Sequence, residues 1–456
     1  ADVRFGAVST DSRTLRAGEL FVALRGERFD GHGFLENAAA AKAAAALVDK
    51  DYAGELPLPA AVVADTRLAL GTLARHWRAR FHPALVAVAG SNGKTTVKEM
   101  LASILRLHAG DEAVLATAGN LNNDIGVPLM LLRLRHQHRW SAIELGMNHK
   151  GEIAYLADLA RPTAALVNNA QREHLEFMHS VQEVAAENAA VYDALPADGV
   201  ALVNADDAHA GTFRSRAGAR RTVEFGLDAP AAVTGRCRLQ ALSSELSLRT
   251  PGGEAQATLA IPGVHNVRNA LAAIAVAQEV GIEAGLIGEG LRLFAGVKRR
   301  LEVVGERGGV TVYDDFAHHP TAVAETLAGL RAAHPAARIW AVFEPRSASS
   351  CRRVFQGDFA RAFAGASDVL IAPVFRSTLP EAERLSVPRL VQDLIARGQP
   401  ARAAESNDDI IRVIVQEHSP GDLVVVMSNG GFGGIHQKLL QALGDPAGVA
   451  GAAETE

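Results

Sequence analysis

One short segment near residue 90 restricts the fold of this chain more than any other part of it. The apolar run Leu85–Ala89 is typical of a buried strand, and the glycine-containing segment Gly90–Thr96 (GSNGKTT) follows it directly. Beyond the segment, apolar residues at positions 97, 100, 101, 104 and 105 repeat with helical spacing. A strand, a glycine-containing turn and a helix in this order present backbone N–H groups to a phosphate. The segment therefore predicts a helix-covered parallel sheet with a phosphate-binding loop at its edge.

The residue types in this loop suit nucleotide chemistry. Lys94 is predicted to neutralise the β and γ phosphates of ATP, and the Thr95 hydroxyl to ligate the magnesium ion that bridges them. The strict phosphate-loop pattern requires glycine where this chain has Val88, so the match is partial. An incidental strand-to-helix turn is the alternative, and it is disfavoured because Lys-Thr-Thr follows the turn immediately. The residues of this segment predicted to bind ATP are Gly90, Ser91, Asn92, Gly93, Lys94, Thr95 and Thr96.

Chain length and the alternation of strand-like and helix-like segments predict three α/β domains. At 456 residues the chain is too long for one typical core. A small domain is expected in residues 1–82, a parallel-sheet domain in 83–297 and a second, Rossmann-like unit in 298–456. The expected strands include Ala142–Leu145, Ala164–Asn168, Val200–Val203, Val310–Tyr313, Ile339–Phe343, Val369–Ala372 and Leu423–Met427, and helices are expected at 321–333, 386–397 and 408–417.

Charge and cysteine content argue against several functional classes. The net charge of -5 offers no field for nucleic acid or an anionic membrane, so local groups must hold any anionic substrate. Cys237 and Cys351 are too few for a disulfide framework or a clustered metal site, which favours a reducing cytoplasm. The chain shows neither an apolar stretch of about 20 residues nor a basic-then-apolar leader at Ala1, so we expect neither membrane insertion nor export.

Longer motifs resemble the Mur ligase family, whose members use ATP to join an amino group to a UDP-muramyl-peptide carboxylate. Ala89–Glu99 is similar to the ATP loop of the family, and Thr117–Pro128 resembles the branch that adds D-alanyl-D-alanine. Ser9–Arg13 and Leu20–Asp30 resemble the UDP-recognising domain of that branch and of the diaminopimelate-adding one. The similarity covers about residues 1–294 and implies the three-domain Mur ligase fold. The substrate-binding residues that it implies are Ser9, Thr10, Asp11, Ser12, Arg13, Asn120, Asn122, Asn123 and Asp124.

The same resemblance implies magnesium ligands in addition to Thr95. Glu144 and His174 resemble the metal ligands of the family, and each stands at or just past the end of an expected strand. A carboxylate and an imidazole can complete a magnesium shell with phosphate oxygens and water, although imidazole is the less usual ligand. Many Mur ligases carry a carbamylated lysine after this histidine, but here Asn188 stands at that position and cannot be carbamylated. Either Asn188 or Glu187 contributes neutral or water-mediated contacts, or the site works without that group.

Further nucleotide residues are expected beyond the loop, and they are His265, Asn266, Asn269, Arg300 and Asp315. The first three open an apolar helix, where amide side chains can read an adenine edge, with helix capping by Asn266 as the alternative. The resemblance implies that Arg300 reaches the ATP phosphates, that Asp315 holds the ribose and that His318 lies near the reacting phosphate. The residues assigned to catalysis are Lys94, His318 and Arg300.

From about residue 295 onward the resemblance changes branch. The motifs at 296–302, 313–320, 343–347 and 427–436 look like those of murein peptide ligases, which recycle an intact tripeptide. The chain therefore reads as a hybrid, natural or constructed, with its junction near Phe294. Arg346 is expected to bind an incoming carboxylate in a bidentate way, and the glycines of 430–434 to form a backbone nest for it, with a flexible turn as the alternative. The substrate-binding residues implied here are Arg346, Ser347, Gly430 and Gly431.

These resemblances imply a ligase that adds D-alanyl-D-alanine to UDP-N-acetylmuramoyl-tripeptide through an acyl phosphate, with ATP and Mg²⁺. The implied partners are the UDP-muramyl-peptide and either the dipeptide or a murein tripeptide, and other cell-wall synthesis enzymes fit the same context. A recycling ligase that joins a tripeptide to UDP-N-acetylmuramate is the alternative among enzymes, and the asparagine-rich segment 119–128 argues against it. A nucleotide-binding scaffold without ligase activity is the alternative from another class.

Overall fold

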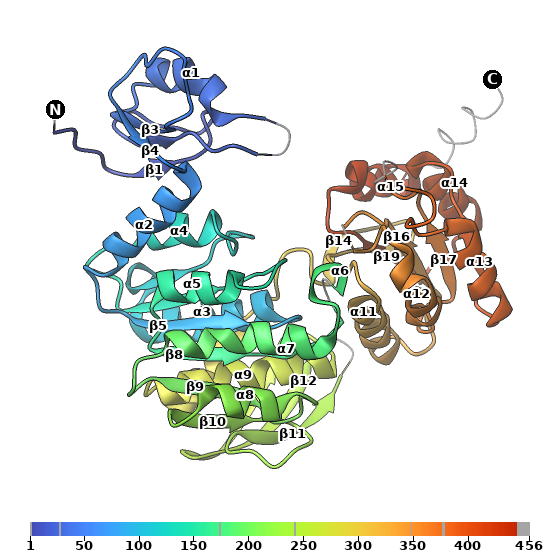
Figure 1. The fold of residues 1–456 in the computed structure, drawn as a ribbon. Helices are drawn as coiled ribbons and strands as arrows, with labels where there is room; N and C mark the ends of the chain where they lie inside the picture. Colours follow the sequence, from blue (N-terminus) through green and yellow to red (C-terminus); the bar gives the residue numbers. More distant parts are fainter. Residues whose placement is uncertain are drawn as a thin grey trace.

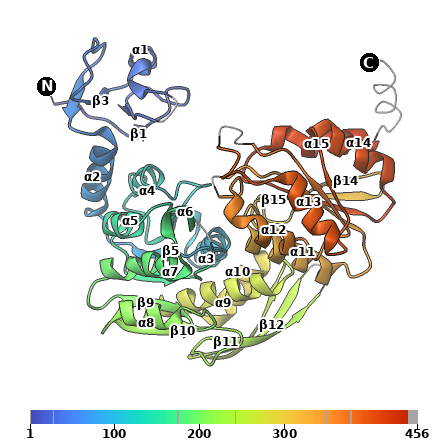
Figure 2. The same cartoon turned by 45° about the vertical axis from the view of Figure 1, so that its right-hand side comes forward.

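Three α/β domains follow one another along the chain, and each has its own sheet (Figure 1). The computed structural model describes residues 2–26, 29–172, 175–240, 243–347, 349–375 and 379–444. The N-terminal domain stands on one end of the central domain, and the C-terminal domain lies beside the central domain (Figures 1 and 2). Within the described ranges, no helix is both long and apolar enough to cross a membrane.

The N-terminal domain is a small parallel sheet with strand order β1-β2-β3-β4. Its core is apolar on both faces, because Leu35 of α1 packs on one side and Leu70 of α2 on the other. Helix α2 begins where the Asp65 carboxylate accepts a hydrogen bond from the Leu68 N–H, and it connects this domain to the central one. The elements are β1 (Val8–Ser9), β2 (Leu20–Val22), α1 (Leu35–Ala40), β3 (Ala45–Asp49), β4 (Ala60–Val63) and α2 (Thr66–Arg78).

The central domain is a parallel sheet with strand order β10-β9-β8-β5-β7-β6 and helices on both faces. Successive side chains of β5 alternate between the two cores, with Leu85 and Ala87 on one side and Val86 and Val88 on the other. The strands are β5 (Ala84–Ala89), β6 (Val114–Ala116), β7 (Trp140–Glu144), β8 (Ala164–Val167), β9 (Val200–Asn204) and β10 (Arg221–Phe225). The helices are α3 (Lys94–Ala109), α4 (Gly126–Leu131), α5 (Glu152–Ala160), α6 (Leu175–Met178), α7 (Val181–Ala189), α8 (Ala210–Ala217), α9 (Val264–Glu279) and α10 (Ala284–Leu293).

A three-stranded antiparallel sheet, absent from the sequence-based prediction, extends the central domain. It consists of β11 (Thr234–Leu239), β12 (Ser244–Thr250) and β13 (Gly253–Leu259). Leu246, Leu248 and Leu259 of this sheet join the same core as α3, α9 and α10. The sheet therefore supports the helix whose first turn carries the His265 motif.

The C-terminal domain has a mixed sheet with strand order β14-β15-β19-β16-β17-β18, in which only the β14–β15 pair is antiparallel. The last strand in sequence, β19, lies in the middle of the sheet, between β15 and β16. The strands are β14 (Glu302–Arg307), β15 (Val310–Asp315), β16 (Ile339–Phe343), β17 (Asp368–Ile371), β18 (Ala401–Ala403) and β19 (Leu423–Met427). The helices are α11 (Pro320–Ala333), α12 (Gln356–Ala362), α13 (Val387–Ala396), α14 (Asn407–Glu417) and α15 (Ile435–Gly444).

Candidate active site

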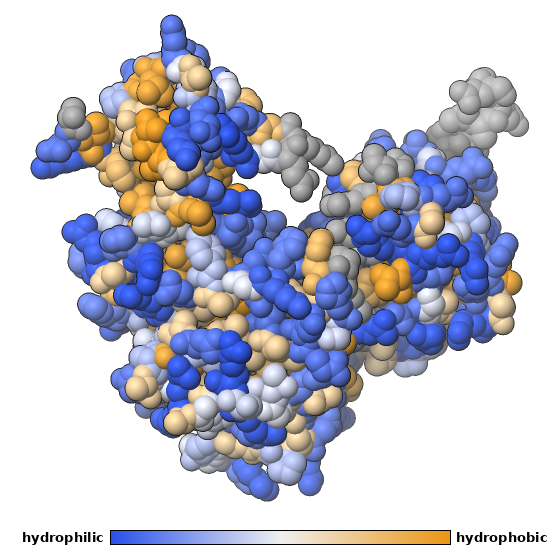
Figure 3. All heavy atoms as spheres, viewed as in Figure 1, coloured by the Kyte–Doolittle hydropathy of each residue, from blue (hydrophilic) through white to orange (hydrophobic). Residues whose placement is uncertain are grey.

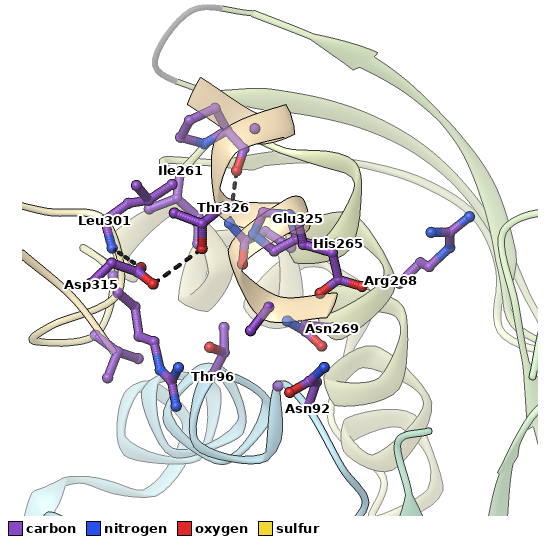
Figure 4. Close-up of a pocket in the computed structure, with 18 of the residues that line it drawn as sticks. Asn92, Thr96, Ile261, His265, Arg268, Asn269, Leu301, Asp315, Glu325 and Thr326 are labelled. Carbon is purple, nitrogen blue, oxygen red and sulfur yellow. Dashed lines mark hydrogen bonds between the residues drawn. The ribbon is translucent and has the colours of Figure 1, made fainter. Parts of the chain in front are cut away.

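A cavity of about 1120 Å³ lies between the central and C-terminal domains. Its walls come from the phosphate loop (Gly90–Thr96), the start of α9, the linker around residues 295–303, β15 and α11 (Figure 4). A polar, partly enclosed space of this size at the carboxyl end of a parallel sheet is where α/β proteins bind nucleotides. The predicted nucleotide residues that line it are Asn92, Gly93, Thr96, His265, Asn266, Asn269, Arg300 and Asp315.

The phosphate loop has the backbone geometry that the glycines predict. Gly93 has φ of 75°, and a Cβ at this position would lie 2.3 Å from Asn269 Oδ1, so both conformation and space require glycine. Helix α3 begins at Lys94, and its first-turn N–H groups have no partner within the helix. The Lys94 ammonium donates to the carbonyl oxygens of Gly90 and Ser91, the second at 3.0 Å. The loop thus combines helix N–H groups with one fixed positive charge, which suits phosphate.

Glu144, at the end of β7, has the environment of a metal ligand. Its side chain is buried, and Oε1 accepts a hydrogen bond of 2.7 Å from Asn122 Nδ2. Oε2 is also buried and has no hydrogen-bond partner among the described residues, although a buried carboxylate oxygen normally has one. A cation would satisfy this oxygen, so the chain fits magnesium here. The described residues contain no cluster of three or more His, Cys, Asp or Glu side chains able to hold a metal, and the other predicted ligand, His174, lies outside them.

Asn188, the residue in place of the carbamylated lysine, supports the phosphate loop directly. It is buried, its Oδ1 accepts a hydrogen bond of 2.8 Å from the Gly90 N–H, and its Nδ2 donates to the Val184 carbonyl at 3.1 Å. The carboxylate of Glu187 accepts hydrogen bonds from the N–H groups of Gly151 and Ile153, both 2.9 Å, at the start of α5. Both side chains are therefore engaged in holding the backbone around the site.

We expect Asn188→Ala to destabilise the fold without changing the magnesium requirement. The substitution leaves the buried Gly90 N–H without its acceptor, which costs about 1–3 kcal/mol. Denaturant unfolding measures this loss, and magnesium titration of the reaction rate measures the requirement. A magnesium midpoint that shifts as far as in a Glu144 variant would contradict the assignment of Asn188 to the loop backbone.

The amides at the start of α9 serve both the fold and the cavity. Asn269 Oδ1 accepts a hydrogen bond of 2.9 Å from Asn168 Nδ2, which joins α9 to the end of β8. Asn266 Nδ2 donates to the Pro262 carbonyl at 2.7 Å and so holds the turn before the helix. Helix α9 has no side-chain cap, because its N-cap is Gly263, so Asn266 does not have the capping role weighed as the alternative, and it lines the cavity.

His265 remains neutral at physiological pH. Burial lowers its pKa from 6.5 to about 4, and the positive charges of Arg268 and Arg300 act in the same direction. A Cβ on Gly329 of α11 would lie 3.4 Å from His265 Cε1, so the ring faces the C-terminal domain. The neutral ring suits a face that packs against another domain.

The lowered pKa of His265 makes the free energy of unfolding depend on pH. We expect this free energy to decrease as the pH falls from about 6.5 to about 4. The depressed pKa means that the unfolded chain takes up the proton first, so the contribution of His265 is complete above pH 6.5 and is lost as the pH falls through 4. The shift corresponds to about 3 kcal/mol. Denaturant unfolding across this range, compared with His265→Gln, measures it, and identical pH profiles for the two proteins would refute the prediction.

The linker between the two larger domains is held in an unusual backbone conformation. Arg299 and Leu301 have φ of 61° and 51°, a region that residues other than glycine rarely adopt. Arg299 donates to the Asp314 carboxylate at 3.0 Å and to the carbonyl oxygens of Ser428 and Gly430. These contacts fix the linker so that the exposed Arg300 side chain lines the cavity.

Asp315, predicted to hold the ribose, is buried and already accepts several hydrogen bonds. Oδ2 accepts from the Leu301 N–H and Oδ1 from the Ala317 N–H, both at 2.8 Å, and Thr326 Oγ1 lies 3.1 Å from Oδ1 (Figure 4). Burial raises the pKa of Asp315, whereas Arg300 and these hydrogen bonds act in the opposite direction. Asp315 thus ties the linker to β15 in addition to lining the cavity.

Of the two adjacent histidines, His319 makes the contact with the phosphate loop. Its Nε2 lies 2.8 Å from Asn92 Oδ1, and Nδ1 accepts from the Ala322 N–H at the start of α11. His318, the predicted catalytic histidine, lies with Nδ1 2.8 Å from the Phe316 carbonyl, and it does not belong to the described lining of the cavity. The N-cap position turns the His319 ring towards the loop, and the role of His318 near the reacting phosphate stays a prediction.

At the carboxyl end of the C-terminal sheet the predicted amine-binding residues come together. Arg346 packs on Gly430 so closely that a Cβ there would lie 2.0 Å from Arg346 Nε. The guanidinium stacks 3.7 Å above the ring centroid of Phe375, with Nη1 3.4 Å from Glu344 Oε1. Ser347 instead uses its hydroxyl within its own turn, where it accepts from the Ser350 N–H at 2.9 Å. Gly431 follows at the start of the 3-10 turn Phe432–Gly434.

The predicted substrate residues of the first two domains lie at the end of β1 and on the exposed or half-buried loops that follow β1 and β6. Asp11 accepts two hydrogen bonds from the Arg13 guanidinium, which help to lower its pKa to about 2, and Ser9 Oγ donates to the Asp11 carbonyl. Asp124 pairs with Arg67 of α2 at 2.6 Å and so connects the two domains. Asn123 caps α4 by accepting from the Gly126 N–H. The remaining positions, Thr10, Ser12 and Asn120, lie in the same loops.

Apolar side chains are exposed on the same N-terminal domain. Figure 3 shows hydrophobic surface on the side of this domain that faces the viewer. Phe29 and Leu68 are 67% and 60% exposed, and Phe34 is 41% exposed. Of the segment Leu20–Asp30, Glu27 and Arg28 lie outside the described residues.

Sequence reasoning missed several polar residues of the cavity, which are Asn168, Asn169, Gln171, Arg268 and Glu325. The first three directly follow β8, and their signal was their position at the carboxyl end of an expected parallel strand. Glu325 lies on α11 of the other domain and had no such signal.

Comparisons with known proteins identify relatives over most of the chain. The Mur ligase middle domain matches residues 88–277, the Mur ligase glutamate ligase domain residues 299–430 and the catalytic domain of the Mur ligase family residues 4–78. The UDP-N-acetylmuramoyl-tripeptide--D-alanyl-D-alanine ligase of Escherichia coli is 44% identical over 66% of this chain and 66% of its own length. The enzyme of the same name from Haemophilus influenzae is 42% identical over 69% of this chain and 68% of its own length. A crystal structure of MurF from Acinetobacter baumannii, 28% identical, matches 95% of this chain and 93% of its own with a TM-score of 0.82.

Proposed function

Because the chain belongs to the Mur ligase family, we propose that it joins D-alanyl-D-alanine to the peptide carboxylate of UDP-N-acetylmuramoyl-tripeptide, using ATP. The names of the Escherichia coli and Haemophilus influenzae relatives support this substrate pair, and each match spans about two thirds of the relative. The observation that carries the proposal is the cavity, since it joins the phosphate loop to Arg300 and Asp315 of the linker and C-terminal sheet.

The first chemical step activates the carboxylate, because oxide is too poor a leaving group for direct attack by an amine. A carboxylate oxygen of the peptide attacks the γ-phosphorus of ATP, the bond to the β–γ bridging oxygen breaks, and ADP leaves. Lys94 and the first-turn N–H groups of α3 hold the phosphates in line for this attack. Arg300, exposed on the other wall, supplies the second fixed positive charge.

The second step forms the amide. The neutral amine of the incoming dipeptide attacks the acyl-phosphate carbonyl, and the tetrahedral intermediate expels phosphate, which takes up the proton that the amine loses. Arg346 holds the dipeptide carboxylate by two parallel hydrogen bonds, and the backbone N–H of Gly431 serves the same ligand, whereas the Gly430 N–H donates to Ser428 Oγ. The close packing of Arg346 on Gly430 supports this assignment, because it brings the guanidinium to the end of β19.

Magnesium belongs to the same proposal. Glu144 and Thr95 would hold it on the protein side, together with His174, and when bound it supplies charge neutralisation to the phosphates. The unpartnered Glu144 Oε2 supports this ligand set. Asn122, which donates to the other oxygen, orients the carboxylate for that role.

The choice of amine rests on the C-terminal domain. Because its motifs resemble murein peptide ligases, we propose strong binding of UDP-muramyl-tripeptide together with weakened or altered use of the dipeptide. Residues 9–13 and 120–124, which would read the nucleotide substrate, precede the junction near Phe294, whereas Arg346 follows it. Joining a tripeptide to UDP-N-acetylmuramate is the second candidate, and the sequence motifs at 343–347 and 427–436 favour it.

Mass spectrometry of the products tests both candidates. UDP-muramyl-tripeptide and UDP-muramate are each offered with ATP and either D-alanyl-D-alanine or the murein tripeptide. We expect the dipeptide adduct of UDP-muramyl-tripeptide, and calorimetric titration is expected to show that this nucleotide binds more tightly than UDP-muramate. A tripeptide adduct of UDP-muramate alone would overturn the proposal in favour of recycling. ATP binding with neither an adduct nor substrate-dependent phosphate release would leave only a nucleotide-binding role.

A further inference from the structure

Two residues of the C-terminal domain, one at the start of helix α11 and one within it, are linked to the phosphate loop by a series of side-chain hydrogen bonds. His319, the N-cap of α11, contacts Asn92 at the tip of the loop, across 227 positions of sequence. Asn92 Nδ2 donates to Gln171 Oε1, and Gln171 Nε2 donates to Glu325 Oε1 at 3.5 Å. Glu325 lies on α11 again, about one and a half turns beyond its start. We call these four residues the interdomain hydrogen-bond chain.

Donors and acceptors along this chain agree with one another. The Ala322 N–H can only donate, so His319 Nδ1 accepts and the proton lies on Nε2, which donates to Asn92 Oδ1. The amide nitrogen of Asn92 is then free to donate to Gln171, whose own amide nitrogen donates to the Glu325 carboxylate. The orientation of each side-chain amide is therefore set by the hydrogen bond that precedes it in the series.

The two loop-side members also hold the loop backbone. The Asn92 N–H donates to Asn169 Oδ1 at 2.8 Å, and the Asn92 carbonyl accepts from Asn168 Nδ2 at 2.7 Å. The Gln171 N–H donates to Ser91 Oγ at 2.9 Å. A shift of α11 away from the central domain would release the side chains that orient Asn92 and Gln171, and with them the loop.

We propose that His319 and Asn92 are positioning residues that make the geometry of the phosphate loop depend on the seating of the C-terminal domain. The catalytic part of this inference rests on the proposed ligase function, whereas its structural part does not. Nucleotide binding uses the loop backbone, so loss of the contact is expected to affect turnover more than affinity. The loop is then fully ordered for phosphoryl transfer only when the domain that carries the amine site is in place.

Two substitutions at one position separate this role from helix capping. His319→Asn keeps an oxygen that can cap α11, as asparagine does well, but is too short to reach Asn92. His319→Gln places an amide nitrogen the same number of bonds from Cβ as Nε2, so it retains the reach and gives a poorer cap. Asn92→Ala removes the contact from the other side.

Hydrogen exchange of the full chain without substrates is the first test. We expect the amides of Ser91 and Asn92 to exchange about ten-fold faster in His319→Asn, the effect of losing one hydrogen bond, and to stay protected in His319→Gln. The amides at the start of α11 should exchange faster in His319→Gln, which caps the helix poorly, than in His319→Asn. If the loop amides keep their protection in His319→Asn, the contact only caps the helix and the inference is overturned.

Turnover of the same variants is the second test. We expect kcat to fall about ten-fold in both His319→Asn and Asn92→Ala, with KM for ATP within about two-fold, and the double variant to be no slower than either single one. A multiplied, hundred-fold loss in the double variant would show that the two residues act independently and would overturn the inference. If the parent protein forms no amide, the proposed function is refuted. The hydrogen-exchange result would still decide whether the loop depends on the contact with His319.

Discussion

Replacing Lys94 by alanine is expected to lower the ligation rate by about 10²- to 10³-fold and to leave the fold intact. The Lys94 ammonium lies at the start of α3 and bonds to the carbonyl oxygens of Gly90 and Ser91, both in its own loop, so its loss costs the fold about 1 kcal/mol. The transferred phosphoryl group, in contrast, loses a fixed positive charge next to it. Phosphate release in the presence of both substrates measures the rate, and thermal unfolding verifies the fold.

Two further variants give this result its meaning. Lys94→Arg retains the charge in a different shape and is expected to fall between the parent and Lys94→Ala. Lys438→Ala removes an exposed lysine of α15 and should keep the parent rate. A folded Lys94→Ala protein with activity near that of the parent would refute the assignment of the phosphate loop.

The second large effect is expected at Glu144. Glu144→Gln conserves the volume of the side chain but removes the charge of a buried carboxylate, of which one oxygen accepts from Asn122 and the other has no partner among the described residues. If this oxygen binds magnesium, the concentration for half-maximal rate should rise by about 10- to 100-fold, the usual effect of disturbing a metal site. Magnesium titration of the rate gives this midpoint.

A second measurement avoids dependence on turnover. Calorimetric titration of ADP with and without magnesium should show a magnesium-dependent gain in affinity for the parent and a smaller gain for Glu144→Gln. Glu417→Gln, an exposed carboxylate paired with Arg402, is the matched control and should behave as the parent. Equal gains in all three proteins would remove Glu144 from the metal site.

Local sequence patterns predicted most of the parallel strands and several helices of the two larger domains, because those signals are short-range, but they did not predict β6, β10 and β18. The strands at Ile339–Phe343 and Leu423–Met427 have the expected bounds, since each is a fully buried apolar run. The antiparallel sheet was missed, although Ser244–Thr250 alternates strictly between buried and exposed positions. Its buried positions include serine and threonine as well as leucine, which weakens the apolar alternation that sequence reasoning relies on.

The candidate site was predictable only where chemistry lies within one segment. Gly90–Thr96 carries its own signal, because loop, charge and helix start are consecutive. The role of Asn188 depends on a hydrogen bond to Gly90, 98 positions away, and no local pattern reports such a pair. The same holds for the two adjacent histidines, since the cap of α11 and not the motif decides which ring faces the loop.

The position of the last strand has a consequence for synthesis on the ribosome. Because β19 lies between β15 and β16, both of these strands must wait with an unpaired edge until residues 423–427 have emerged. Unpaired edges invite association with other chains, and contacts between distant segments form slowly. The N-terminal and central domains have their own sheets and can fold while the rest is still being made. The nascent chain thus carries a folded central domain whose phosphate loop still lacks its contacts with α11, and a chain terminated before Leu423 leaves a split sheet.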